Sequence, residues 1–502
     1  MFRTSPLLLI DFYKAVHAEQ YPKGTEKIVS YYTPRKSRLK EDKVLVHFGL
    51  QYFIKEYLID WMDSEFFRKP IGELEDIYTK FVETNIQDEN ELFPKIKELW
   101  NLGYLPIEIS SLPEGTIVPM GVPCVKIVNT HPDFAWVVGA IESLLSSTLW
   151  HSQMAASVGY WYRQVVNKYY AETVDDSVDP SRALSSFSYR GEESNESAII
   201  SSAGWLTSFC LSATVPSGMF MERYYNADVS AEDVNYGAVS TEHSVMCSNY
   251  AVDGDEITMI KRLLNEIYPN TSFSMVADSY DYWNLVDNLL PLCYNDIMTH
   301  NGKLNIRPDS GNPVDIVLKT IPKLWDMFGG TKNSKGYKVL DPHIGLVYGD
   351  SITLERCKSI YEGLKDLGFA ANNVSLGVGS FSFQCVEEIE EGGAVLKPFT
   401  RDTFCSAVKA TYCEVNGKPI PIFKDPKTDD GHFKKSHRGC CAVVESNGTL
   451  MCIEGMDEKS EKSSKWNLIK PVFYNSGMVK EESLSGIRQR LMEEGKKYGY
   501  DH

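Results

Sequence analysis

The feature that most constrains the fold is a series of short apolar runs, each ending in a polar turn. Four runs lie between residues 273 and 380, and stretches with helical spacing, such as Leu354–Leu367, separate them. The runs and their turns are Phe273–Val276 before Ala277–Asp281, Leu304–Ile306 before Arg307–Gly311, Ile344–Tyr348 before Gly349–Ser351, and Val374–Leu376 before Gly377–Ser380. Strands that alternate with helices form a parallel sheet or barrel. In such folds the loops at the carboxyl ends of the strands carry the functional site.

The segments before and after this series have a different pattern. Strand-like Lys27–Tyr32 and helix-like Val46–Met62 lie near the N-terminus, and Thr116–Val128 predicts a hairpin around Gly121. After residue 400, strand-like runs return, together with a basic loop and a terminal surface helix. A second domain built from both chain ends explains this arrangement.

The predicted fold class is therefore α/β, an irregular (β/α) barrel plus a second mixed α+β domain. We expect residues 1–150 to form the N-terminal part of the mixed domain and residues 151–385 to form the barrel-like catalytic domain. Residues 386–502 are expected to return to the mixed domain and to carry the basic loop and the terminal helix.

Charge and cysteine content argue against several classes of protein. The 502-residue chain has a net charge of −17, whereas a general nucleic-acid binder needs a broad basic surface. No apolar run approaches the length of a membrane span, and Leu7–Ile10 is too short for a secretory signal. Among the 11 cysteines, adjacent Cys440 and Cys441 suit neither a zinc site nor an easy disulfide. Reduced cysteines in a cytoplasmic protein fit this pattern best.

The turns after the four strands share a composition that suits a phosphorylated sugar. Carboxylates suit ribose hydroxyls or Mg²⁺, arginine suits diphosphate, and glycines let backbone N–H groups approach phosphate oxygens. The residues concerned are Asp278, Asp281, Arg307, Asp309, Ser310, Gly311, Gly349, Asp350, Gly377 and Gly379. Each motif alone is explained as well by a tight turn or a local ion pair. Their expected convergence on one face favours a site.

These motifs belong to a longer ordered set that resembles the nicotinamide phosphoribosyltransferase family over nearly the full chain. The matching segments are Asp11–Lys14, Gln20–Pro22, Phe48–Tyr52, Phe187–Gly191, Glu242–Ser244, Asp278–Asp281, Ile306–Pro313, Asn333–Lys338, Thr400–Asp402 and Phe423–Pro426. The resemblance implies the type II phosphoribosyltransferase fold, a homodimer with shared active sites, and Mg²⁺-assisted chemistry. The implied reaction joins nicotinamide to 5-phosphoribosyl 1-diphosphate, giving nicotinamide mononucleotide and diphosphate in NAD synthesis.

The resemblance also implies roles for individual residues. Phe187 and Tyr13, the latter from the second subunit, resemble the rings that stack on the base, with Arg190, Asp11 and Ala213 nearby. Residues that resemble the ribose, diphosphate and phosphate contacts are Arg307, Asp309, Gly349, Asp350, Asp281, Gly379, Ser380, Arg401, Ser406, Lys409 and Lys424. Mg²⁺ is expected near Asp309 and Asp350. His243 resembles a histidine that ATP phosphorylates in an accessory cycle, with Glu242 beside it, and the expected catalytic set is His243, Glu242, Arg307 and Asp309.

Three departures from the family pattern leave the substrates open. Ala213 stands where the family carries an aspartate for the carboxamide, so nicotinic acid is an alternative base. Ser380 and Phe381 replace phosphate-binding glycines, and about a dozen extra residues follow, around Val386–Lys397. An ADP-ribosyl diphosphate donor, which would give NAD directly, is therefore a second alternative. A non-catalytic binding protein on this fold is a third, although an inert scaffold has no reason to keep the charged set together.

Overall fold

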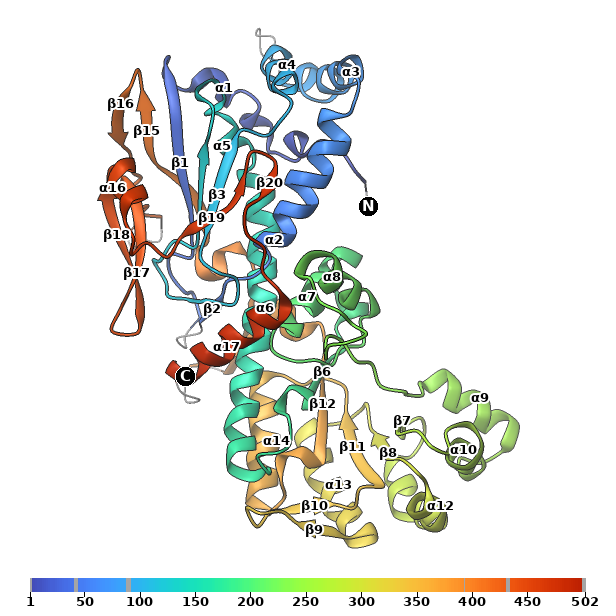
Figure 1. Ribbon diagram of the computed structural model, residues 1–502. Helices are drawn as coiled ribbons and strands as arrows, with labels where there is room; N and C mark the ends of the chain where they lie inside the picture. Colours follow the sequence, from blue (N-terminus) through green and yellow to red (C-terminus); the bar gives the residue numbers. More distant parts are fainter. Residues whose placement is uncertain (1, 40–43, 87–91, 392, 430–433, 499–502) are drawn as a thin grey trace. The chain divides into compact units, whose positions relative to one another are not determined.

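The computed structural model describes residues 2–39, 44–86, 92–391, 393–429 and 434–498, and it divides into two compact units (Figure 1). Unit 1 comprises Met1–Ser157, Glu222–Ala227 and Phe399–Lys497, and unit 2 comprises Val158–Met221, Asp228–Pro398 and Tyr498–His502. The boundaries predicted at residues 150 and 385 lie before the observed ones. Helix α6 (Glu142–Thr173) runs unbroken across the first boundary, and the hairpin β13 (Cys385–Glu390)–β14 (Gly393–Pro398) belongs to unit 2.

Unit 2 contains the parallel sheet that the sequence predicts. Its strands, in sheet order, are β6 (Leu184–Ser186), β12 (Val374–Val378), β11 (Ile344–Tyr348), β8 (Leu304–Arg307) and β7 (Phe273–Val276). All four pairings are parallel. The apolar runs are buried on both faces of the sheet, which is the pattern of strands covered by helices on the outside.

Short parallel bridges extend this sheet into a closed ring. The bridged pairs are Ser186 with Ser212, Leu211 with Tyr236, and Ser240 with Ser274. The segments 211–212 and 236–240 thereby connect the two edge strands, β6 and β7. The predicted irregular barrel is confirmed, and it brings the carboxyl ends of its strands to one rim.

The barrel helices begin where the sequence provides capping residues. Asn312 accepts hydrogen bonds from the first turn of α13 (Pro313–Phe328), and Pro313 occupies the first helical position, where a missing N–H costs nothing. Thr353 caps α14 (Leu354–Asp366) in the same way. The other helices and strands of this part of the chain are α7 (Asn195–Leu206), α8 (Val215–Tyr225), α9 (His243–Asp253), α10 (Ile257–Arg262), α11 (Tyr282–Asn284), α12 (Tyr294–Thr299), α15 (Phe381–Gln384), β9 (Gly330–Lys332) and β10 (Lys338–Leu340).

Unit 1 is built on an antiparallel sheet to which both chain ends contribute. Its strand order is β16 (Lys418–Pro421), β15 (Ala407–Val415), β1 (Thr25–Thr33), β5 (Val125–Asn129), β3 (Ile107–Ser111), β19 (Lys470–Tyr474) and β20 (Gly477–Met478). The further elements are α1 (His17–Gln20), α2 (Leu50–Phe53), α3 (Ile71–Phe81), α4 (Phe93–Leu102), α5 (Val137–Ala140), α16 (Glu458–Ser463), α17 (Leu484–Tyr498), β2 (Leu45–Val46), β4 (Ile117–Val118), β17 (Cys440–Ser446) and β18 (Thr449–Met456). Pairing of β1 with β15 joins the two ends of the chain, which confirms the predicted second domain.

Two local predictions for unit 1 are wrong. The hairpin around Gly121 does not form, because β4 pairs with β2 while β5 lies between β1 and β3. Pro119 and Pro123 flank this turn and lack the N–H groups that a hairpin ladder needs. The helix predicted from Val46 begins only at Leu50, since Val46 belongs to β2 and Gly49 adopts a left-handed φ of 99°. No described helix is long and apolar enough to cross a membrane.

Candidate active site

The aromatic ring of Phe187 lies on a floor of two glycines at the barrel rim. A β-carbon added at Gly377 would lie 2.3 Å from Phe187 Cδ2, and one at Gly349 would lie 2.9 Å from Cε2. Any side chain at either position would therefore displace the ring. Phe187 is half-buried, so one face is covered by the glycines while the rest of the ring remains accessible. This arrangement suits a planar ligand stacked on the outer face.

A histidine and two carboxylates lie together at the ends of the neighbouring strands. His243 Nε2 is 4.0 Å from Asp278 Oδ1 and 3.9 Å from Asp309 Oδ2, and His243 Nδ1 is 3.0 Å from Ser279 Oγ. The imidazole is half-exposed, whereas the side chain of Asp278 is only 4% exposed. Because His243 is the first residue of α9, it also lies at the positive end of a helix dipole.

Asp278 holds the loop that carries Asp309. Its Oδ2 accepts a hydrogen bond from the backbone N–H of Asp309 (2.8 Å) and another from Ser310 Oγ (2.6 Å). Its Oδ1 is buried and has no hydrogen-bond partner among the described residues. One buried carboxylate therefore positions the 308–310 turn and presents its free oxygen toward His243.

Arg307, the last residue of β8, supplies a cation beside these carboxylates. Its Nη1 donates a hydrogen bond to Ser240 Oγ (3.0 Å), which fixes the guanidinium against the barrel rim. Burial lowers the pKa of Arg307, and Asp309 opposes this effect. An arginine nevertheless remains charged at neutral pH. Its buried Nε has no partner among the described residues, so it has donor capacity left for an anion.

Other predicted residues of unit 2 lie along the same rim. Ala213 follows the segment that bridges Ser186, so it lies beside the end of the strand that leads to Phe187. Asp350 follows β11 and is exposed, accepting a hydrogen bond from Ser351 Oγ (2.7 Å). Arg190 lies close enough to Arg307 to affect its pKa. The rim thus gathers residues from all five strands.

Three predicted residues of unit 2 have visible structural roles. Asp281 caps α11, since its Oδ1 accepts a hydrogen bond from Asn284 N (2.9 Å). Glu242 precedes α9 and accepts a hydrogen bond from the Ser244 hydroxyl. Ser380 lies against Gly191, where an added β-carbon would be 2.0 Å from Ser380 Oγ. The extra residues after Phe381 form the hairpin β13–β14.

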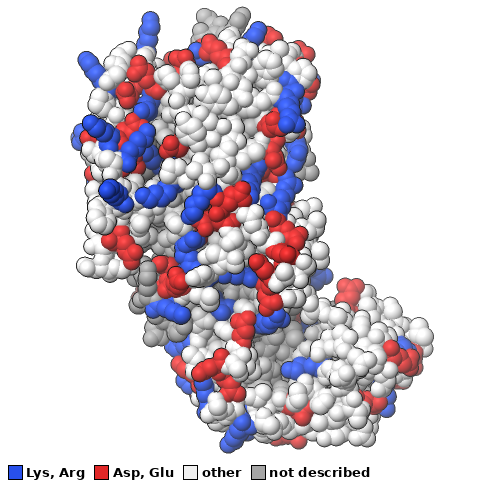
Figure 2. Space-filling model, viewed as in Figure 1, with Lys and Arg blue, Asp and Glu red and all other residues white. Residues whose placement is uncertain are grey.

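A second cluster, in unit 1, forms a cationic cavity of about 220 Å³ that we name the phosphate pocket. It is lined by Tyr31, Thr33, Arg35, Gly121, Ala407, Lys409, Thr411, Lys435, Ser436, His437 and Glu454. Burial lowers the pKa of Lys409, and the cations Arg35, Lys424 and Arg401 lower it further, against Glu142. Lys and Arg side chains are interspersed with Asp and Glu across the face seen in Figure 2, so this local clustering of cations distinguishes the pocket.

The predicted residues of unit 1 gather around Lys409. Glu142 lies 3.6 Å from Lys409 Nζ and accepts a 2.6 Å hydrogen bond from Lys14 Nζ. Asp11 accepts a hydrogen bond from Ser143 Oγ (2.6 Å), and Tyr13 is 60% exposed beside it. The ring of Tyr13 is thus available to a ligand from outside this unit.

Two further residues of this set differ in how they face the phosphate pocket. Ser406 is buried, where it contacts Tyr32, and the adjacent Ala407 lines the cavity instead. Lys424 is held next to the pocket, because its backbone N–H donates a hydrogen bond (2.8 Å) to Oγ of Ser436, which lines the cavity. Lys424 and Arg401 therefore supply charge near the pocket without being among its lining residues.

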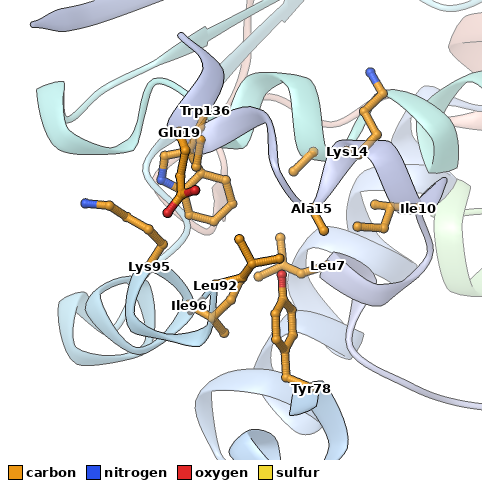
Figure 3. Close-up of a pocket in the computed structure, with 12 residues that line it drawn as sticks. Leu7, Ile10, Lys14, Ala15, Glu19, Tyr78, Leu92, Lys95, Ile96 and Trp136 are labelled. Carbon is orange, nitrogen blue, oxygen red and sulfur yellow. The ribbon is translucent and has the colours of Figure 1, made fainter. Parts of the chain in front are cut away.

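A smaller cavity of unit 1, shown in Figure 3, lies beneath the N-terminal segment. Leu7, Ile10 and Tyr78 line it with other apolar side chains, and the stem of Lys14 passes at its edge. Its volume of about 20 Å³ has room for about one water molecule. It therefore does not hold a base or a sugar phosphate.

The oxygen atoms at the barrel rim fit Mg²⁺. Among the described residues, Asp309 and Asp350 are not part of a tight cluster of three metal-binding side chains. Mg²⁺ does not need one, because it is usually held by one or two carboxylates, substrate phosphates and water. The exposed carboxylate of Asp350 and the partly exposed one of Asp309 suit a site that the substrate completes.

Comparison with known proteins agrees with this geometry. Residues 183–452 match the model of the nicotinate phosphoribosyltransferase (NAPRTase) family, and residues 5–109 match the nicotinamide phosphoribosyltransferase N-terminal domain. The chain is 35% identical to the nicotinamide phosphoribosyltransferase of Acinetobacter baylyi, with 98% of each chain covered. The chain therefore belongs to the NAPRTase family and is a relative of the nicotinamide phosphoribosyltransferases.

Other members and solved structures extend the comparison. The nicotinamide phosphoribosyltransferase of Xanthomonas campestris is 28% identical, covering 96% of this chain and 97% of that relative. The nicotinate-nucleotide pyrophosphorylase of Pyrococcus furiosus superposes with a TM-score of 0.59 at 14% identity, covering 98% and 96% of the two chains. Human nicotinic acid phosphoribosyltransferase gives 0.52 at 13% identity, with 97% and 93% covered. The likeness to these two structures confirms the type II phosphoribosyltransferase fold.

Within this family fold, the structure adds residues to which the sequence pattern assigned no individual role. Asp278 was only one of several carboxylates after strands, yet it is the buried one that positions Asp309. Arg35 lies two residues after the end of β1, Lys435 lies in the basic loop, and both line the phosphate pocket. Placement after a strand was the available signal for Asp278 and Arg35. Burial, which separates Asp278 from Asp281, could not be read from the sequence.

Proposed function

We propose that this protein joins nicotinamide to 5-phosphoribosyl 1-diphosphate, giving nicotinamide mononucleotide and diphosphate. The observation that carries the proposal is the ring of Phe187, which lies on Gly349 and Gly377 beside Arg307 and Asp309. A stacking platform for a planar base thus adjoins a cation for a leaving diphosphate. Several relatives are named nicotinamide phosphoribosyltransferase, and the first of them matches over 98% of each chain.

The proposed reaction exchanges one bond at C1 of the ribose. The C1–O bond to diphosphate breaks, and its electron pair leaves with the diphosphate. The lone pair of the pyridine nitrogen forms the new C1–N bond, which leaves a positive charge on the base. Arg307 faces the charge that develops on the diphosphate, and preorganised cations of this kind are a large source of rate enhancement. Phe187 holds the neutral base in line for attack.

Mg²⁺ held by Asp309 and Asp350 together with the diphosphate would neutralise part of the leaving-group charge. Asp278 contributes by fixing the turn that carries Asp309, through the hydrogen bond to its backbone N–H. The guanidinium of Arg307 is held by its hydrogen bond to Ser240 Oγ. The protein's own part is therefore to keep a carboxylate and a guanidinium at fixed positions around a charged substrate.

The donor has anionic groups at both ends, and we propose that the phosphate pocket takes the 5-phosphate. Arg35, Lys409 and Lys435 line that pocket and supply the cations. Tyr13 would cover the second face of the base. These residues belong to unit 1 and the base platform to unit 2. We propose a homodimer in which the two sets meet across the subunit interface, so that each dimer holds two sites.

His243 supports a proposed accessory cycle with ATP. An imidazole between two carboxylates at a helix N-terminus can carry a phosphoryl group, because the helix dipole favours the added anion. Glu242 precedes it on the same turn. ATP would serve here as phosphoryl donor and would not be the ribosyl donor.

An ADP-ribosyl diphosphate donor is the second candidate. Ser380 lies against Gly191 at the rim where the family has glycines, and the hairpin β13–β14 follows directly. These changes alter the part of the rim that the family resemblance assigns to the 5-phosphate of the donor. Such a donor would give NAD in one step.

The deciding experiment incubates the purified protein with each base and each donor, and identifies the products by mass. Nicotinamide and nicotinic acid are each paired with phosphoribosyl diphosphate and with ADP-ribosyl diphosphate. Nicotinamide mononucleotide as the main product supports the proposal. NAD formed only from the ADP-ribosyl donor would replace it with the second candidate, and no product with any pair would favour a binding role.

A further inference from the structure

One face of the β17–β18 hairpin in unit 1 carries three side chains that bind metals. Val443 pairs with Cys452 across the hairpin. The register of the hairpin shifts between Cys440 and Ala442, and the Sγ atoms of Cys441 and Cys452 lie within 4.8 Å of each other, on the side where Glu454 contacts His437. Cys441 is buried, Cys452 is partly buried and Glu454 is 51% exposed. Two thiols and a carboxylate therefore point to the same side.

His437, four residues before Cys441, completes this group. The Sγ atoms of Cys441 and Cys452 and a ring nitrogen of His437 all lie within 4.8 Å of one another. Among the described residues, this is the single group of three potential ligands with such spacing. His437 Nδ1 is 3.8 Å from Cys452 Sγ and 3.0 Å from Glu454 Oε2.

The second ring nitrogen of His437 fixes which atom faces the cluster. Nε2 is 3.0 Å from the carbonyl oxygen of Gly121, an acceptor, so Nε2 carries the proton. Nδ1 is the nitrogen that faces the thiol of Cys452 and the carboxylate of Glu454. Metal-binding histidines usually have this arrangement, with the non-ligating N–H donated to a carbonyl or carboxylate.

We propose that His437, Cys441, Cys452 and Glu454 bind a divalent transition metal of the zinc class. Thiolate, imidazole and carboxylate together are ligands that select zinc over magnesium or calcium. Zinc lies about 2.3 Å from sulfur and about 2.0–2.1 Å from nitrogen, so tetrahedral ligands are about 3.5–3.8 Å apart. The observed spacing reaches this value with small side-chain rotations. Glu454 can adjust most easily, since half of its side chain is exposed.

This metal would hold one wall of the phosphate pocket. His437 and Glu454 line that cavity, and Lys435 lies two residues before His437. The bound ion would tie the segment that carries Lys435 to the β17–β18 hairpin. It would have a structural role distinct from that of Mg²⁺ at the barrel rim, because its ligands include sulfur and come entirely from unit 1.

The test measures metal content of the full-length protein, expressed in zinc-supplemented medium and purified under reducing conditions without chelator. Elemental analysis is expected to find one zinc ion per chain. After removal of the metal, titration with Co²⁺ is expected to give the visible absorption of tetrahedral cobalt and a thiolate-to-cobalt charge-transfer band. Both signals are independent of catalytic activity.

Two ligand variants and one control decide the assignment. Cys452 and His437 are both partly exposed, so Cys452→Ser and His437→Gln are expected to leave the hairpin folded. Each variant is expected to weaken Co²⁺ binding by more than the roughly 10–100-fold that is lost when a residue supporting a metal ligand is changed. Cys413→Ser, at another half-buried free cysteine on β15, is expected to bind like the wild type. Absence of stoichiometric metal in the reduced wild type would overturn the proposal. So would an unchanged cobalt spectrum in Cys452→Ser, or a Cys441–Cys452 disulfide in protein that takes up no metal after reduction.

Discussion

Gly377→Ala is the sharpest test of the base platform, because it adds one methyl group beneath the ring of Phe187. The new carbon would lie 2.3 Å and 2.4 Å from Phe187 Cδ2 and Cε2, and 2.8 Å from Gly349 Cα. Carbon atoms in contact are about 3.5–4.0 Å apart, so the ring must move by about 1.2 Å or more. Gly377 does not have a left-handed φ, so alanine can adopt its backbone conformation and the effect comes from the added carbon.

The expected loss follows from that displacement. A shift of about 1 Å in a positioned group can lower the rate by about 100-fold, and we expect kcat/KM for the base to fall by that order. Overpacking at the buried site adds a stability cost of about 1–3 kcal/mol. Steady-state kinetics with varied nicotinamide at saturating donor measures the first effect, and thermal unfolding measures the second.

Two controls separate these effects. Gly363→Ala would place a carbon 2.5 Å from Leu318 Cδ1, away from the site, so it is expected to lower stability while kcat/KM stays near the wild-type value. In a Phe187→Ala background the clash with the ring is removed and only the contact with Gly349 Cα remains, so Gly377→Ala is expected to cost less than in the wild type. A folded Gly377→Ala enzyme with kcat/KM within about twofold of wild type would refute the stacking role of Phe187.

The remaining predictions concern sharing of the site, the histidine and the base. Co-expressed Arg307→Ala and Arg401→Ala chains are expected to recover roughly one quarter of wild-type activity, since about half the dimers are mixed and each of these has one intact site; no recovery despite subunit exchange would place both residues in one chain's site. His243→Ala is expected to abolish stimulation by ATP and to spare basal transfer, so an ATP effect that survives in this variant would exclude a phosphohistidine. Ala213→Asp is expected to increase the preference for nicotinamide over nicotinic acid, by roughly the 1.5–3 kcal/mol of a hydrogen bond to a charged group, measured as a ratio of kcat/KM values. A wild type that uses nicotinic acid at least as well would make the nicotinamide assignment wrong.

The barrel could be predicted because its sequence signal is local. Each buried strand is a short, largely apolar run that ends in a polar turn, and after Ile344–Tyr348 a capped helix follows. Parallel strands then bring the turns to one rim, which places Arg307 and Asp309 together without further information. The pairing partners of β4 and β5 were missed for the opposite reason. A short antiparallel strand can pair with a strand from any part of the chain, and no local sequence pattern specifies its partner.

Roles that depend on burial could not be predicted. Asp278 and Asp281 lie in the same motif, yet one is buried beneath Asp309 and the other caps a helix at the surface. Ser406 immediately precedes β15 and Ala407 is its first residue, yet only Ala407 lines the phosphate pocket, whereas Ser406 is buried against Tyr32. Residues of one motif can therefore have different roles, and a motif match does not show which of them is buried and which reaches a site.

The proposed zinc-class site was hidden from the sequence by the same kind of long-range pairing. Adjacent Cys440 and Cys441 suggested no site, because neighbouring residues on a strand point to opposite faces. The group forms only when β18 brings Cys452 next to Cys441 and when the carbonyl of Gly121, more than three hundred residues earlier in the chain, orients His437. Three segments must therefore be folded before the ligands meet. Metal affinity at this hairpin is consequently coupled to folding of unit 1, so metal binding would stabilise the unit that carries Lys409 and Arg35.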